Sequence, residues 1–168
     1  MTSLTVSESR QQHTAAPAQF LSFMLGQDMF AMGILAVREI LEYAGVTPVP
    51  QMPPAISGVI NLRGTAVPVL DLARRLEREP SPIGKRTCII VVEVEGEEGP
   101  FVIGILVDAV NAVLDIAATE IEPPPRFGAV RADLLNGIGK VNGRFVLLLN
   151  VQHVLSNLHL AELAEQFA

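Results

Sequence analysis

The sequence predicts a mainly β protein that is built from two copies of one small unit. The stretch 58–72, GVINLRGTAVPVLDL, returns without a gap at 137–151 as GIGKVNGRFVLLLNV, and FAMGIL at 30–35 returns at 101–106 as FVIGIL. A sequence that repeats itself in this way indicates a supersecondary unit that is used more than once. Two small barrels or sheets packed together are therefore expected, and the groove between them is an obvious place for a binding site.

Composition supports an aliphatic core and argues against nucleic-acid binding. Hydrophobic residues make up 49% of the 168 residues, aromatic residues only 5%, and Trp is absent. The chain therefore offers few aromatic side chains on which the bases of a nucleic acid could stack. The net charge of −6 repels phosphate backbones. We expect no nucleic-acid partner, and another protein is the favoured partner.

The cysteine usage and the N-terminal composition indicate the compartment. Cys88, the single cysteine, lies in an apolar run and is interpreted as a packed structural thiol. This usage fits a reducing compartment. Residues 1–18 lack an apolar stretch, which predicts a disordered tail and not a signal peptide. No run approaches the ~18 apolar residues of a membrane span. A cytoplasmic protein is expected.

Turn and breaker residues divide the first half into short elements. Gly26–Asp28 separates two apolar runs, which predicts a hairpin of strands 20–25 and 29–32. Residues 34–43 combine helical spacing with alternation, which favours a short helical turn followed by a strand. Four prolines within 47–54 predict an extended crossing segment. A further strand is expected at 66–70, and Asp71 is expected to cap a helix over 72–79.

The second half repeats this plan after a break at 79–84. Asn142-Gly143 is the strongest short turn signal in the chain and predicts a hairpin over 137–150. Asn150 stands at the position of Asp71 and is expected to cap a C-terminal helix over 151–165. The other expected strands are 87–94, 101–107 and 109–114. The first barrel is expected over about 28–80 and the second over about 85–150, and strand 20–25 joins either of them.

Catalytic, metal-binding and phosphate-binding patterns are not found in the sequence. The glycines of 137–143 lie in a hairpin pattern without the helix that a phosphate loop needs. The three histidines lack a spacing that converges on a metal ion. Asp108 and Asp115 are interpreted as solvated loop ends. We therefore expect no catalytic residue, no metal and no cofactor.

Positions at which the two halves differ chemically are candidates for function. The first half carries Glu39 and Arg63 where the second carries Val110 and Asn142. A Glu39–Arg63 pair near one end of a barrel is one hypothesis, and two unrelated exposed charges are the alternative. An exposed pair alone adds only ~0.2–1 kcal/mol, whereas truncating a hot spot of an interface costs ~2 kcal/mol or more. The nearby valines, which are either core or the apolar centre of a recognition site, are Val37, Val110 and Val113.

At these residues the sequence resembles the CheW family, the coupling proteins of bacterial chemotaxis. The resemblance runs from Phe20 to about Leu158, and its most specific parts are 34–40, 58–64 with 67–72, and 104–108 followed by 113–114. It implies two five-stranded SH3-like barrels and an adaptor without catalytic activity. Gly33 departs from the acidic residue that the family often carries there, which bears on the exact receptor partner.

The resemblance also implies two partners. They are the cytoplasmic hairpin tip of chemoreceptors and the regulatory domain of the histidine kinase CheA, so any membrane association is indirect, through the receptors. Carried over by position, the receptor groove comprises Val37, Glu39, Asn61, Leu62, Arg63, Val110 and Val113. The kinase-facing edge comprises Val46, Ser57 and Gly58. The alternatives are a CheW-like adaptor of another receptor–kinase pathway, such as twitching motility, and a small β-barrel enzyme or ligand sensor.

Overall fold

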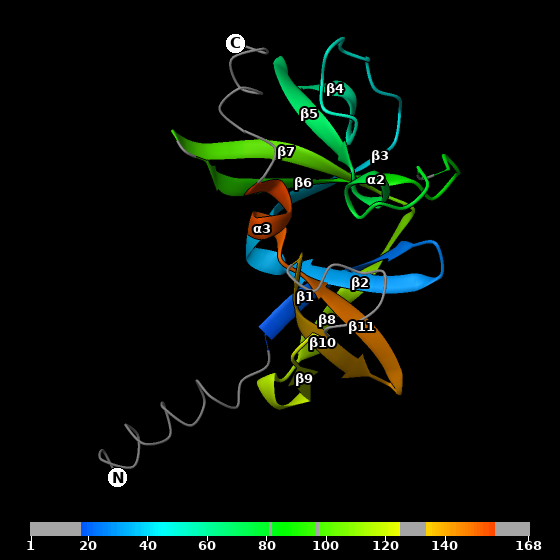
Figure 1. Ribbon diagram of the computed structural model, residues 1–168, viewed down its shortest axis with the longest axis vertical. Coiled ribbons are helices and arrows are strands. Elements are labelled where there is room, and N and C mark those ends of the chain that lie inside the picture. Colours follow the sequence, from blue (N-terminus) through cyan, green and yellow to red (C-terminus); the bar gives the residue numbers. More distant parts are fainter. Residues whose placement is uncertain (1–17, 81, 97, 125–133, 157–168) are drawn as a thin grey trace.

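The computed structural model describes residues 18–80, 82–96, 98–124 and 134–156, and its strands form two sheets (Figure 1). The six-stranded sheet has the order β8 (Ala109–Ile116), β1 (Ala18–Leu25), β2 (Asp28–Gly33), β11 (Arg144–Leu149), β10 (Leu135–Val141) and β9 (Ile121–Glu122). The five-stranded sheet has the order β3 (Val37–Glu42), β6 (Cys88–Gly96), β7 (Gly99–Val107), β5 (Thr65–Asp71) and β4 (Ile56–Leu62). The short helices are η1 (Ile34–Ala36), α2 (Leu72–Arg75), η2 (Ala118–Glu120) and α3 (Val151–Ser156).

The mainly β fold and the two-sheet architecture are confirmed, but the sheets do not follow the expected boundaries at 28–80 and 85–150. β2 belongs to the six-stranded sheet, whereas β6 and β7 belong to the five-stranded sheet. A parallel ladder inserts β7 beside β5, and a second one sets β11 beside β2. Each sheet is thus completed by strands from both halves of the sequence. The strand at 20–25, which the sequence left open, lies in the six-stranded sheet.

The apolar pattern of β6 explains this exchange. Ile90 and Val92 face the large core between the two sheets, while Ile89 and Val91 face a separate cluster inside the five-stranded sheet. A strand that is apolar on both faces must be covered on both faces. An interior position between β3 and β7 provides that cover. Cys88, at the start of β6, is half-buried against the core between the sheets.

Among the described residues, the core between the sheets is the largest of three apolar clusters. It contains Phe23 and Phe30 from the six-stranded sheet, Ile105 from the five-stranded sheet, and Val154 from α3. A second cluster fills the interior of the six-stranded sheet, where Val146 lies. This shared aliphatic and aromatic layer packs the two sheets against each other.

Both expected helix caps are formed. The Asp71 carboxylate accepts a hydrogen bond from the backbone N–H of Ala73 at 3.1 Å, and the Asn150 side chain accepts one from the backbone N–H of His153 at 2.9 Å. α2 was expected to reach 79 but ends at Arg75. The expected extent of α3 beyond 156 lies outside the described residues. So does the expected tail 1–18, apart from Ala18, which begins β1.

Within the described ranges, no helix has both the length and the apolar character needed to cross a lipid bilayer.

Candidate interaction surfaces

Glu39 and Arg63 form an ion pair at an exposed end of the five-stranded sheet. Nη2 of Arg63 lies 3.0 Å from Oε1 and 2.8 Å from Oε2 of Glu39. The Arg63 side chain is 72% exposed and the Glu39 side chain 28% exposed. The hypothesis that the two residues pair is confirmed. Because β3 and β4 are the two outer strands of this sheet, the pair joins its opposite edges.

The turn between β4 and β5 places Arg63 in this position. Arg63 and Gly64 have φ values of 52° and 86°, which are typical of a two-residue hairpin turn with both central residues left-handed. The Asn61 side chain accepts a hydrogen bond from the Gly64 N–H at 2.8 Å and stabilises the turn. The repeated turn in the second half, at Asn142 and Gly143, has φ values of 52° and 78°. Only the first turn carries a charged residue at this position.

An apolar cleft of about 270 Å³ lies beside the pair. Its lining residues are Arg38, Glu39, Leu62, Arg63, Thr65, Val67, Val91 and Val102. Leu62 is thereby brought together with Glu39 and Arg63, as predicted. Arg38 and Thr65 were not singled out from the sequence. The comparison of the halves could have indicated Arg38 as a candidate, because the uncharged Ala109 stands at its position in the second copy.

The three predicted valines do not join this cleft. Val37 and Val110 are half-buried, and both pack against the core between the sheets, one from β3 and the other from β8. Val113, on the outer strand β8, is 50% exposed. The predicted groove residues are therefore divided between the two sheets. Of the three predicted valines, Val113 is the one with an exposed side chain.

Val46, Ser57 and Gly58 lie together along the other part of the seam between the outer strands. Thr47 and Val59 exchange two backbone hydrogen bonds of 2.8 and 2.9 Å. Val46 packs against the cluster inside the five-stranded sheet and lines a cleft of about 530 Å³ along this seam. Ser57 is half-buried. The structure thus places all three predicted edge residues around one backbone bridge.

Gly58 is required by this bridge, and replacing it with alanine is expected to destabilise the fold by about 1–3 kcal/mol. A Cβ atom at this position would lie 2.4 Å from the Thr47 carbonyl oxygen. The backbone exchange between Thr47 and Val59 would have to open. Gly33→Ala is the control, because a Cβ atom there meets nothing within 4 Å. Chemical denaturation measures both variants, and equal stability of the two would contradict the steric argument.

In the part of the chain that the structure describes, no three His, Cys, Asp or Glu side chains come together as a metal site. The glycine-rich stretch 137–143 forms the β10–β11 hairpin.

Comparison with known proteins establishes the family. The profile of the CheW-like domain matches residues 19–159, which is most of the chain. The chain belongs to this family. It is similar to the chemotaxis protein CheW of Klebsiella aerogenes, with 35% identity over 144 residues that cover 85% of this chain and 84% of the relative. The protein FrzA of Myxococcus xanthus is also 35% identical over 144 residues, covering 84% and 88% of the two chains.

A solved structure supports the same assignment. The crystal structure of the scaffolding protein TtCheW from Thermoanaerobacter tengcongensis superposes with a TM-score of 0.74 at 30% identity, and the match covers 82% of this chain and 87% of that one. The CheW-like family, the two-sheet fold and the role of a chemotaxis coupling adaptor are thereby confirmed. The chain is accordingly a non-enzymatic adaptor.

Proposed function

We propose that this adaptor holds the cytoplasmic hairpin tip of a chemoreceptor and the regulatory domain of the histidine kinase CheA at the same time. It would do so in the cytoplasm and would meet the membrane only through the receptor. The observation that carries the proposal is the Glu39–Arg63 pair beside an apolar cleft. A surface of this kind combines charge specificity with an apolar centre, as protein interfaces do.

The receptor surface would be centred on Glu39, Leu62 and Arg63. Arg63 is mostly exposed while its partner carboxylate is more covered, so the guanidinium retains donors that point to solvent. An arginine with free donors can bind acceptors on an approaching helix hairpin. The valines of the core between the sheets, Val37 and Val110, would extend this surface toward the six-stranded sheet, where Val113 is exposed.

The kinase surface would be the seam around Val46, Ser57 and Gly58. An open cleft lies along this seam beside the backbone bridge between Thr47 and Val59. Outer strands with unpaired backbone groups are ready sites for another β protein. A regulatory domain that itself resembles this family would present such strands.

Strand β4 separates the two proposed surfaces. Gly58 lies near its beginning, and Arg63 follows its end. Five residues of strand span roughly 17 Å, so two partners can be held side by side by one rigid element. Any effect of the adaptor on kinase activity must then come from different affinities for two kinase states.

Binding assays with the two partners presented separately and together test this proposal. The purified chain is titrated by calorimetry with a receptor-tip fragment, with the kinase regulatory domain, and with one partner after saturation with the other. We expect binding to each, and an affinity for the second partner that is within about threefold of its value alone. Mutual exclusion of the two partners, or binding to neither, would contradict the proposal.

The relative named FrzA gives a reason to test a second receptor–kinase pathway. The same titrations are repeated with the receptor tips and kinase domains of each CheA-like pathway of the source organism. The pathway whose components bind most tightly is the one that this adaptor serves.

A further inference from the structure

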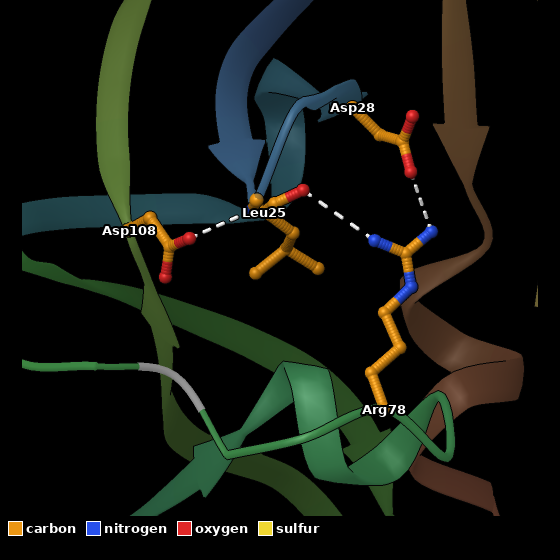
Figure 2. A network of polar contacts seen from close by, with 5 residues as sticks. Leu25, Asp28, Arg78 and Asp108 are labelled. Carbon is orange, nitrogen blue, oxygen red and sulfur yellow. Dashed lines mark hydrogen bonds and ion pairs between the residues drawn. The ribbon is translucent and has the colours of Figure 1, made fainter.

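The turn between β1 and β2 is held from one side by Arg78. Nη2 of Arg78 lies 2.7 Å from Oδ2 of Asp28, and Nη1 donates to the backbone carbonyl of Leu25 at 3.4 Å (Figure 2). The guanidinium carbon also lies 5.5 Å from the centre of the Phe30 ring, within the range of a cation–π contact. The guanidinium therefore contacts both ends of this turn and the aromatic ring beneath it.

Asp108 holds the same turn from the other side. Its Oδ2 accepts a hydrogen bond from the backbone N–H of Gly26 at 2.7 Å, and its own backbone N–H donates to the carbonyl of Met24 at 3.0 Å. Figure 2 shows Asp108 and Arg78 on opposite sides of Leu25. The second oxygen of Asp108, Oδ1, is buried without a hydrogen-bond partner among the described residues. A buried carboxylate oxygen without a partner costs desolvation energy, which the hydrogen bonds of Asp108 to the turn offset.

Arg78 and Asp108 both lie on chain segments that lead out of the five-stranded sheet. Arg78 follows α2, and Asp108 stands between β7 of the five-stranded sheet and β8 of the six-stranded sheet. The chain turn after α2 fixes where Arg78 lies. The N–H of Glu77 bonds to the carbonyl of Arg74, and the N–H of Arg78 bonds to the carbonyl of Ala73. This is the Schellman pattern, and Glu77 takes the left-handed position with φ of 62°.

We infer that Arg78 and Asp108 are positioning residues, which fix the two sheets relative to each other so that the valines of the receptor surface lie in register. This inference rests on the proposed function. Asp108 helps to place Val110 within the six-stranded sheet, because Val110 is opposite Phe23 and Ala109 is opposite Met24 in the β1–β8 ladder of that sheet. The two bonds of Asp108 to Met24 and Gly26 begin this ladder. Val37 packs on the same shared core from the other sheet.

The inference predicts a specific pattern of partner affinities. Loss of the contacts that Arg78 and Asp108 make should disturb the receptor surface, which includes residues of both sheets. The kinase surface around Val46 and Gly58 lies within the five-stranded sheet and should stay unchanged. We expect Arg78→Ala and Asp108→Ala to lower the affinity for the receptor tip roughly fivefold or more. The affinity for the kinase regulatory domain should stay within about twofold of wild type.

Conservative variants and matched controls separate positioning from general destabilisation. Asp108→Asn keeps an acceptor for the Gly26 N–H and should restore most of the receptor affinity. Arg78→Lys keeps a positive charge near Asp28 but loses the second nitrogen, which donates to the Leu25 carbonyl. It should give an intermediate affinity. Arg74→Ala and Asp115→Ala change exposed charges on the neighbouring elements α2 and β8, and should bind as wild type does.

A distance measurement tests the position of the sheets without any partner. Spin labels are placed at the exposed residues Glu42 and Lys140, one on each sheet, in a Cys88→Ser background, and the distance distribution is measured by pulsed electron resonance. A broader or shifted distribution in Arg78→Ala supports the inference, and an unchanged one overturns it. Equal losses of receptor and kinase affinity would also overturn it. If the wild-type chain bound neither partner, the proposed function would fail, and the distance distribution would still decide the positioning role.

Discussion

Replacing Phe23 with alanine is expected to lower the free energy of unfolding by about 3–5 kcal/mol. Phe23 is fully buried, and its ring stacks on that of Phe30 with centroids 5.9 Å apart. Both rings belong to the core between the two sheets. Truncation would remove buried apolar surface and leave a cavity that the surrounding strands can close only in part. A loss of this size is a large part of the stability of an ordinary domain.

The exposed Phe145 provides the matched control. It lies on β11 with 63% of its surface exposed, so Phe145→Ala should change the unfolding free energy by less than about 0.5 kcal/mol. Urea denaturation followed by circular dichroism measures both variants. A small loss for Phe23→Ala, similar to that of the control, would show that the layer between the sheets contributes little to stability.

The local elements of this fold could be predicted from the sequence because their signals are local. Asn142-Gly143 fixes one hairpin turn, Asp71 and Asn150 cap their helices, and the helical turn before β3 follows the mixed spacing of 34–43. The early end of α2 could not be predicted, because Glu77 takes a left-handed conformation that glycine usually adopts. Nothing in the residue type indicates it.

Strand order was the part that the sequence left undetermined. An apolar run such as 89–92 shows that both faces are buried, but it does not specify the neighbours of the strand. The repeat suggested that each copy forms its own barrel, whereas β6 and β7 complete the sheet of the first copy. Parallel pairing between distant segments depends on global packing, and no short pattern encodes it.

Some residues of the candidate sites could be predicted from the sequence and others could not. Glu39 and Arg63 could be found because the second copy lacks both charges, so the comparison of halves singled them out. Asp108 was interpreted as a solvated loop end, but one of its oxygens is buried. Its partner is the backbone of a turn 82 residues away in sequence. A contact of this kind leaves no trace in residue spacing.

Reversing the charge of Arg63 is expected to weaken receptor binding while leaving the fold intact. Arg63→Glu would remove an exposed ion pair worth only ~0.2–1 kcal/mol and set two carboxylates side by side. The melting temperature should therefore fall by only a few degrees. The affinity for a receptor-tip fragment should fall by roughly thirtyfold, which corresponds to about 2 kcal/mol for the loss of a hot-spot arginine.

The double variant Glu39→Arg with Arg63→Glu separates two ways in which the pair could act. It restores an ion pair across the edges of the five-stranded sheet but exchanges the charges that a partner meets. Recovered affinity would mean that the pair shapes the cleft, whereas continued weak binding would mean that the receptor reads the guanidinium itself. Arg144→Glu, which changes an exposed charge on the other sheet, is the control for net charge. Wild-type affinity in Arg63→Glu, or an equal loss of kinase binding, would remove this residue from the receptor surface.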